Sequence, residues 1–324
     1  MKNNLFIIGN GFDRGHNMIT SYNHFKDWLI EEYPESEDID NFIVTDATLM
    51  PKGEMYISDD ALASFLFYCI NETVGDDWAN FEEALGKIDW ELLFDDVDDV
   101  TGRDGEIDLW KTAYAREDFT STLNLNAYAF SKLFSQWIRT ITYPKDITRN
   151  SFLTDTLKNT SFFLTFNYTK TLEDIYSILP EQICHIHGVQ GGNIVIGHGV
   201  EKSSESIGSC SNDEDDFEDD YESDYDFGMK GIDDIHNSLR KPTKQILERT
   251  PFFEDLKYHD IKDIFSWGFS FSTVDLCYIK AICKTLATAN ITWHLHDRGN
   301  GEPAKFEQLL RQCGFIGDIT TFKA

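Results

Sequence analysis

Polar residues that could do chemistry follow apolar runs at four places in this chain. Each group comes where a buried strand is expected to end, and the four groups are Gly9–Asp13, Thr165–Tyr168, His185–Gly188 and Gly268–Ser270. Asparagine and histidine can orient a ligand or accept a proton, and glycine lets the backbone approach an anion closely. Because the carboxyl ends of parallel strands meet at one edge of a sheet, we expect these groups to line a single ligand site.

The first group is a Gly-Asn-Gly turn at residues 9–11, directly after the apolar run Leu5–Ile8. A buried strand that runs into two glycines predicts a nucleotide phosphate bound near residue 10. A plain tight turn after a strand also needs glycine, so both interpretations stay open on this stretch alone. A helical pattern then begins at Thr20-Ser21, where either hydroxyl could cap the helix.

Two of the polar residues admit a structural explanation beside a catalytic one. Asn167 could cap a helix that begins near Thr169. His187 could be a hydrogen-bonded histidine of the core. The two interpretations are left open for each residue, and only the convergence of all four groups on one sheet edge favours a site.

The elements that must position these groups are strands that are mostly apolar throughout, as expected of strands covered on both faces. The strand-like runs are Leu5–Ile8, Phe162–Phe166, Ile183–His187, Asn193–Ile196, Ile261–Phe269, Ile291–His296 and Ile319–Phe322. After residue 160 they alternate with helical patterns at Thr169–Leu179, Val274–Ala289 and Pro303–Cys313. This alternation predicts an α/β fold, a Rossmann-like and mostly parallel sheet flanked by helices. The stretch Ile183–Ile196 is too short for a crossover helix, which favours a hairpin there.

A largely helical block of residues 60–142 separates the first strand from the next confident one. Trp78, Phe81, Leu85 and Ile88 fall at helical spacing, and residues 126–141 carry an apolar stripe. We interpret the block as a large helical insertion within a single α/β domain of residues 1–324. Such an insertion could cover the ligand site at the carboxyl ends of the strands.

Composition narrows the partners and the compartment. The formal charge of −29 opposes non-specific binding to nucleic acid. No apolar run approaches the ~20 residues that span a bilayer, and the N-terminus lacks a signal-peptide pattern. The six cysteines form no Cys-x-x-Cys pair, which argues against structural zinc and a disulfide framework. We therefore expect a cytoplasmic protein with no membrane partner and no direct nucleic-acid binding.

Ten of the fourteen residues in Asp213–Asp226 are acidic. We interpret residues 211–227 as an acidic low-complexity loop in solvent. Phe217, Tyr221 and Tyr225 recur at a four-residue spacing, so docking on a basic partner surface, or imitation of nucleic acid, is an open alternative. Calcium binding is disfavoured because the glycine placement of a calcium loop is missing.

Several strings resemble the AbiH family of bacteriophage abortive-infection proteins. The string IIGNGFD at residues 7–13, followed by TSYNHF at 20–25, is similar to the start of that family. Similar later motifs are WANFE at 78–82, FNYT at 166–169, HIHG at 185–188, IGHG at 196–199, and GFS at 268–270 with Asp275. The resemblance runs nearly end to end, outside the acidic segment. The family usually has glycine where this chain has Asn17, and asparagine tolerates positive φ better than most residues.

The same motifs resemble, more distantly, sirtuin-like NAD-consuming domains. In those domains a Gly-x-Gly turn binds the diphosphate, an asparagine contacts the nicotinamide ribose, and the histidine of a His-Gly pair acts as base. The resemblance implies these roles for Gly9 and Gly11, for Asn167 and for His187. The cysteine-rich zinc module of the deacylases is absent from the sequence, which argues against acyl-lysine removal. Two positions depart from that pattern: Thr169 stands where sirtuins carry aspartate, and Asp13 where they carry serine.

The resemblance implies a sirtuin-like NAD glycohydrolase of anti-phage defence, with NAD as substrate and no metal. Asn167 would orient the ribose hydroxyls or the attacking water, and His187 would accept a proton near neutral pH. The predicted nucleotide-binding residues are Gly9, Asn10, Gly11, Phe12, Asp13, Thr165, Tyr168, Gly268, Ser270 and Asp275. A cell cannot tolerate constitutive loss of NAD, so we expect a homo-oligomer or a defence partner protein to restrain the activity.

Two other functions are kept beside this one. The first is a catalytically inactive sensor of the same fold, which binds NAD or ADP-ribose within a defence complex. The second is a metal-dependent hydrolase, whose candidate ligands are His185, His187, His198, His294 and His296. We expect these histidines to be core or ligand-contacting residues rather than metal ligands.

Overall fold

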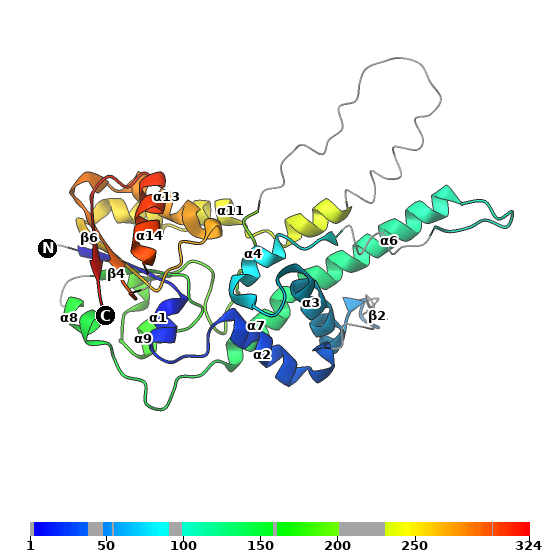
Figure 1. The fold of residues 1–324 in the computed structure, drawn as a ribbon, viewed down its shortest axis with the longest axis horizontal. Helices are drawn as coiled ribbons and strands as arrows, with labels where there is room; N and C mark the ends of the chain where they lie inside the picture. Colours follow the sequence, from blue (N-terminus) through cyan, green and yellow to red (C-terminus); the bar gives the residue numbers. More distant parts are fainter. Residues whose placement is uncertain are drawn as a thin grey trace, which may run out of the picture. The chain divides into compact units, whose positions relative to one another are not determined.

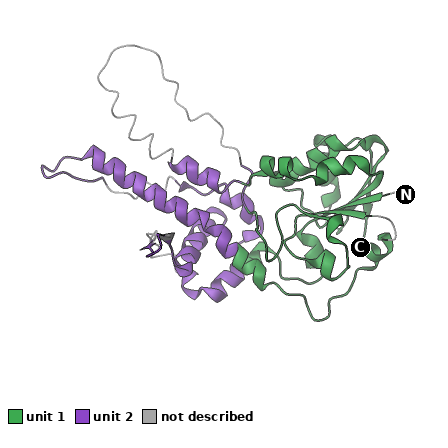
Figure 2. Ribbon diagram, turned by 180° about the vertical axis from the view of Figure 1, so that it is seen from behind, with its two compact units in different colours: residues 1–25, 135–196, 241–324 green, residues 26–134, 197–240 purple. Residues whose placement is uncertain are grey.

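The computed structural model describes residues 3–37, 48–53, 55–90, 99–157, 161–200, 231–299 and 301–324. The chain divides into two compact units, which are coloured separately in Figure 2. Unit 1 comprises residues 1–25, 135–196 and 241–324, and unit 2 comprises residues 26–134 and 197–240. The block 60–142 is therefore shared between the units, and its interpretation as an insertion within a single domain stays a prediction. The acidic loop predicted at 211–227 lies outside the described residues.

Unit 1 is built on a six-stranded parallel sheet in the order β5-β4-β1-β6-β7-β8. Figure 1 labels β4 and β6 of this sheet. The strands are β1 (Asn3–Ile8), β4 (Ser161–Thr165), β5 (Ile183–His185), β6 (Ile261–Trp267), β7 (Thr292–His296) and β8 (Asp318–Phe322). Two strands follow β1 along the chain on one side, and the chain then returns to the other side at β6. This is the strand order of doubly wound dinucleotide-binding folds, with the reversal between β1 and β6. The predicted parallel α/β sheet is confirmed, and its order is compatible with a Rossmann-like fold.

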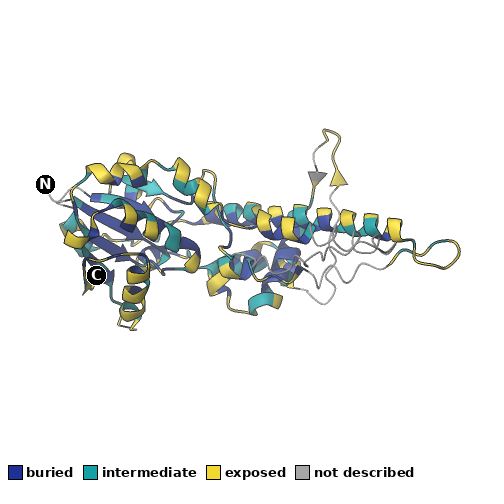
Figure 3. Cartoon of the chain, turned by 90° about the horizontal axis from the view of Figure 1, so that it is seen from above, coloured by how far each residue is buried: buried dark blue, intermediate teal, exposed yellow. Residues whose placement is uncertain are grey.

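Both faces of β1 are covered, which explains its unbroken apolar sequence. Leu5 and Ile7 belong to one core, which includes residues of α13 (Leu276–Thr285) and α14 (Glu302–Gln312). Phe6 and Ile8 belong to a second core, which includes residues of α8 (Ser151–Thr156) and α9 (Thr171–Asp174). The Phe6 ring stacks on those of neighbouring strands, with centroids 5.0 Å from Phe163 and 4.9 Å from Phe265. Figure 3 shows the buried strands surrounded by partly exposed helices.

The other helices of unit 1 are short or connect the strands. They are α1 (Asn10–Gly15), α11 (Thr243–Arg249), α12 (Phe252–Asp255) and the 3₁₀ turns η3 (Pro180–Gln182), η5 (Leu256–Tyr258), η6 (Thr273–Asp275) and η7 (Thr288–Asn290). The chain leaves the unit along α2 (Tyr22–Glu32) and re-enters along α7 (Phe130–Thr140). Ser21 caps α2, because its Oγ accepts a hydrogen bond from the His24 N–H at 3.3 Å.

Two predicted elements of unit 1 differ from the structure. Residues 193–196 form no strand, and only an isolated antiparallel bridge joins Gly188 to Ile194, as in the narrow hairpin expected there. The helix predicted over Thr169–Leu179 is reduced to the single turn of α9. It ends because Ser177 takes a left-handed conformation with φ 57°, and the Ile178 N–H bonds back to Leu172.

Unit 2 is mainly helical. Its elements include α3 (Asp59–Val74), η1 (Pro34–Glu37), η2 (Trp78–Asn80), α4 (Phe81–Leu85), α6 (Leu109–Tyr128) and the hairpin of β2 (Thr48–Leu49) and β3 (Met55–Tyr56). Trp78 and Phe81, predicted on one helical face, are buried and stack with ring centroids 5.6 Å apart. Across the described part of both units, no helix is long and apolar enough to cross a membrane.

Candidate functional site

The strand register brings the four polar groups to one edge of the sheet. Ile8, the last residue of β1, pairs with Thr165 of β4 on one side and with Trp267 of β6 on the other. Thr165 pairs in turn with His185 of β5. These four strands therefore end at the same level, and the segments that follow them leave the sheet together.

The glycine turn after β1 packs against the glycine turn after β6. The N–H of Gly9 donates to the Trp267 carbonyl at 3.0 Å, and the N–H of Gly11 donates to the Gly268 carbonyl at 2.9 Å. Gly268 has φ 65°, and a Cβ on Gly9 would lie 2.5 Å from the Cα of Phe269. The glycines thus allow two backbones of the protein to approach each other. Phosphate binding by Gly9 and Gly11 stays a prediction.

The residues beside this turn are engaged within the protein. The Asn10 amide donates to the Thr20 carbonyl at 2.9 Å, and its Oδ1 accepts from the Thr20 hydroxyl at 2.5 Å. Phe12 is 1% exposed and lies in the core that contains Phe6. The Arg298 guanidinium occupies the space where a Cβ on Gly11 would lie.

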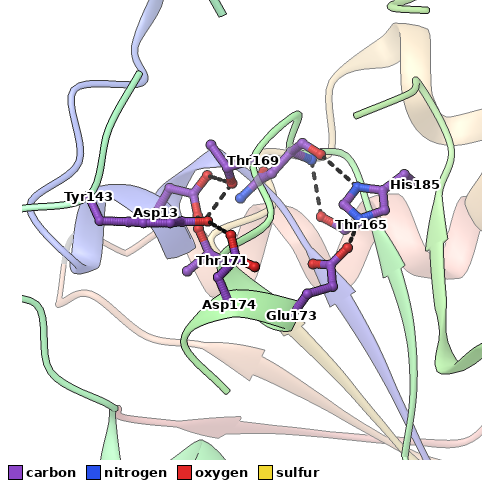
Figure 4. A network of polar contacts seen from close by, with 9 residues as sticks. Asp13, Tyr143, Thr165, Thr169, Thr171, Glu173, Asp174 and His185 are labelled. Carbon is purple, nitrogen blue, oxygen red and sulfur yellow. Dashed lines mark hydrogen bonds and ion pairs between the residues drawn. The ribbon is translucent and has the colours of Figure 1, made fainter. Parts of the chain in front are cut away.

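Asp13 joins α1 to the segment that follows β4 (Figure 4). Its Oδ2 accepts a hydrogen bond from the Thr169 hydroxyl at 2.6 Å, and its Oδ1 accepts one from the Thr171 hydroxyl at 2.9 Å. Burial raises the pKa of Asp13 above its ordinary value of 3.8, while these hydrogen bonds and nearby His16 oppose the shift. The carboxyl group therefore holds two loops of the site edge together.

Asn167 does not cap a helix, since α9 has Lys170 at its N-cap and no side-chain cap. Its side chain is 6% exposed, and neither amide atom has a hydrogen-bond partner among the described residues. The amide lies near enough to Asp13 to favour the charged carboxylate, without a well-formed hydrogen bond. Its backbone N–H donates to the Thr165 hydroxyl at 3.1 Å, which fixes the residue at the end of β4. A buried amide without partners requires an explanation, and a bound ligand or water supplies one.

The side chains of His185 and Glu173 are hydrogen bonded to each other (Figure 4). His185 Nε2 lies 2.8 Å from Glu173 Oε1, and its Nδ1 lies 3.3 Å from the Asn167 carbonyl oxygen. Burial would raise the pKa of Glu173, but the hydrogen bond and charge of His185 outweigh it and lower that pKa. Both ring nitrogens of His185 are thus engaged, which leaves His187 as the better candidate base.

His187 is buried in a polar cluster with Asp275, which is one of the predicted nucleotide-binding residues, and with Tyr278 and Lys241, which sequence patterns did not indicate. The ring is 3% exposed, and its Nε2 lies 3.3 Å from the Tyr278 hydroxyl and 3.7 Å from Asp275 Oδ1. Lys241 Nζ lies 3.5 Å from the same Asp275 oxygen. Burial, with the positive charge of Lys241, lowers the pKa of His187 well below its ordinary value of 6.5. The imidazole is therefore neutral at pH 7.

The remaining predicted residues lie at the rim of this arrangement or outside it. The Tyr168 hydroxyl donates to the Val195 carbonyl at 3.0 Å, and Ser270 is exposed after Gly268. His294 pairs with Asp263 at 2.8 Å, whereas His198 belongs to unit 2. In the described ranges, no three His, Cys, Asp or Glu side chains are placed to hold one metal ion.

Fold and site together define an α/β protein with a doubly wound strand order and a cluster of buried polar groups at the carboxyl edge of its sheet. The sequence model of the AbiH family, described as bacteriophage abortive infection AbiH, matches residues 5–297. The chain therefore belongs to the AbiH family, which assigns it a role in bacteriophage abortive infection. No curated protein and no solved structure matches the chain significantly.

Proposed function

We propose that this AbiH protein is a sirtuin-like NAD glycohydrolase, which splits NAD into nicotinamide and ADP-ribose during abortive infection. Asn167 and His187 are its catalytic residues, and the groups after β1, β4, β5 and β6 bind the nucleotide. An assembly with further copies or with a defence partner restrains the activity in the cell. NAD is the substrate, and no metal takes part.

The buried amide of Asn167 carries this proposal. Its two polar atoms have no partner among the described residues, although the side chain is only 6% exposed. Leaving such a group unpaired costs roughly 1–3 kcal/mol, so its retention is best explained by a ligand that completes its hydrogen bonds. Ribose hydroxyls both donate and accept, which matches an amide that offers one acceptor and two donor hydrogens.

Hydrolysis of NAD requires little from the protein beyond a base and correct positioning of the substrate and water. When the C1′–N1 bond of NAD breaks, nicotinamide leaves with the bonding electron pair, which cancels the positive charge of its ring, so no general acid is needed. Water forms the new bond to C1′, and its proton passes to His187 and then to solvent. A base must be unprotonated, and burial with Lys241 lowers the pKa of His187 so that its ring is neutral at pH 7.

The two departures from the sirtuin pattern compensate each other in space. Thr169 stands where sirtuins carry aspartate and Asp13 where they carry serine, and the two side chains are hydrogen bonded at 2.6 Å. A hydroxyl and a carboxylate thus remain beside Asn167 with their positions exchanged. This exchange supports the carry-over of the sirtuin-like roles to this chain.

A nucleotide sensor without turnover is the second candidate, favoured by the burial of His187. The ring is only 3% exposed, and the amides of Gly9 and Gly11 are bonded within the protein. In that case the site would bind NAD or ADP-ribose, and a partner protein would respond to the occupied state.

Incubation of the purified full-length chain with NAD, with and without a chelator, tests the proposal through nicotinamide release. We expect release in both conditions, and a loss of at least about 100-fold in Asn167→Ala and in His187→Ala. Matched controls are Asn193→Ala, in an exposed loop, and His259→Gln, which precedes β6 at the opposite edge of the sheet. Binding of ADP-ribose without any release would favour the sensor, and release that the chelator abolishes would contradict the metal-free mechanism.

A further inference from the structure

His187 contacts buried polar side chains that come from two other parts of unit 1. Asp275 ends η6 and Tyr278 lies in the first turn of α13, whereas Lys241 begins the last segment of the unit. Asp275 Oδ1 lies between two cationic or ionisable partners, 3.7 Å from His187 Nε2 and 3.5 Å from Lys241 Nζ. The Tyr278 hydroxyl lies 3.3 Å from the same histidine nitrogen. All these polar contacts of the His187 ring are therefore made on its Nε2 side.

We propose that Asp275 and Lys241 are positioning residues for His187, which hold its ring with the hydrogen on Nε2 and the unprotonated Nδ1 toward the substrate. Asp275 Oδ1 lies 3.7 Å from Nε2, which is too far for a hydrogen bond, but its negative charge favours a hydrogen on the ring nitrogen that faces it. The Tyr278 hydroxyl, 3.3 Å from Nε2, then accepts that hydrogen. Among the described residues, the hydrogen bond of His187 is made at Nε2 and not at Nδ1. This assignment rests on the proposed function, because it names the atom that takes the proton from water.

Lys241 has a separate part in this arrangement. A carboxylate alone would favour the imidazolium form of His187, which cannot accept a proton. The Lys241 side chain is 0% exposed, a burial that lysine shows almost only when it is paired. Its ammonium group balances the charge of Asp275, so the carboxylate can orient the ring without protonating it. The Asp275 carboxylate makes no side-chain cap at the start of α13.

The tautomer is measured by ¹⁵N NMR of the full-length chain labelled in its nine histidines. The His187 signals are assigned by their loss in His187→Asn. We expect a protonated Nε2 and an unprotonated Nδ1 at pH 7. The double variant Lys241→Met with Asp275→Asn removes both charges and leaves no single buried charge behind, which keeps the fold accessible. We expect it to show a mixture of tautomers, and Lys280→Met, on the exposed side of α13, to match the wild type.

Turnover supplies a second readout. In the double variant, kcat for nicotinamide release should fall roughly 10- to 100-fold while KM changes less than about threefold, as for a group that acts on the base rather than on binding. The single variant Lys241→Met should move the acidic limb of the pH–rate profile to higher pH, because Asp275 then favours the imidazolium. Lys241→Arg keeps the positive charge, so its acidic limb should lie at the same pH as that of the wild type. Within the described part of the chain, the charged and titratable groups that face His187 are Asp275, Lys241 and Tyr278.

Two results would overturn the positioning role. One is a wild-type His187 that carries its hydrogen on Nδ1, and the other is a double variant with unchanged tautomer and unchanged kcat. The NMR measurement needs no turnover. A wild-type protein with the expected tautomer but without nicotinamide release would therefore contradict the proposed function alone.

Discussion

The N–H of Gly11 donates a hydrogen bond of 2.9 Å to the carbonyl oxygen of Gly268, and this bond joins the turn after β1 to the turn after β6. A Cβ on Gly268 would lie 2.6 Å from the Cα of Gly11, and Gly268 itself has φ 65°. The two turns flank the point where the strand order reverses, which is where ligands bind in doubly wound sheets. Their mutual packing determines the shape of the site edge.

Gly268→Ala should therefore destabilise unit 1. The new methyl group meets backbone atoms of Gly11 and Phe12, which cannot move aside as a flexible side chain could. This clash and the left-handed φ of Gly268 should together lower the free energy of unfolding by roughly 2 kcal/mol or more, as measured with urea. Gly15→Ala is the matched control, because its Cβ would meet nothing within 4 Å. Equal stability of the two variants would contradict the packing role of Gly268.

Asn167→Leu should stabilise the ligand-free protein while it abolishes nucleotide binding. The substitution replaces an unpaired, buried amide with an apolar group of similar size, for an expected gain of about 1 kcal/mol in the free energy of unfolding. NAD should raise the melting temperature of the wild type, because a ligand that binds the folded state stabilises it. It should not raise the melting temperature of the variant, which no longer binds NAD. A variant that is less stable than the wild type would mean that the amide is satisfied without a ligand.

The titration of Asp13 should appear in the pH dependence of stability. Burial raises its pKa above 3.8 in the folded state, against hydrogen bonds from Thr169 and Thr171. Such a group binds its proton more tightly when folded, so its contribution is most favourable below pH 3.8 and is lost as pH rises through the folded pKa. Urea unfolding across this pH interval should show that the free energy of unfolding of Asp13→Asn increases relative to that of the wild type as pH rises. Asp146→Asn, at an exposed position, should show no such trend.

Unit 2 should lose stability in acid through His198. This ring is fully buried: its Nδ1 accepts from the Val200 N–H at 3.2 Å, and its Nε2 bonds to the His236 carbonyl at 2.9 Å. Burial lowers its pKa from 6.5 to about 4, although the bond to His236 opposes the shift. The stabilising contribution is complete above pH 6.5 and is lost as pH falls to about 4, by up to about 3 kcal/mol. His198→Gln should flatten this part of the profile in urea unfolding, and an unchanged slope would assign the acid sensitivity to other groups.

The strands that frame the site were predictable from residue patterns. Unbroken apolar runs such as Leu5–Ile8 identify strands covered on both faces, because a buried strand has no face left for polar side chains. Their alternation with helices implies parallel strands, whose carboxyl ends share one edge, so Asn167 could be assigned to a common site edge with the glycine turns before any contact was known. Local reasoning was weaker. The helix cap that the sequence left open for Asn167 does not form, because α9 begins only after Lys170 and has no side-chain cap.

The contacts of the polar residues were not predictable in this way. Asp13 and Thr169 are 156 positions apart and bond through side chains, and Lys241 reaches Asp275 from a segment with no recognisable motif. Periodicity reports the face on which a residue lies, but a pairing between distant segments depends on strand order and loop course. The same limit applies to Gly11 and Gly268. In the sequence these glycines suggested a ligand site, and in the fold they allow two backbone segments to pack against each other. Strand order is set by the packing of the whole sheet, which no local pattern of residues contains.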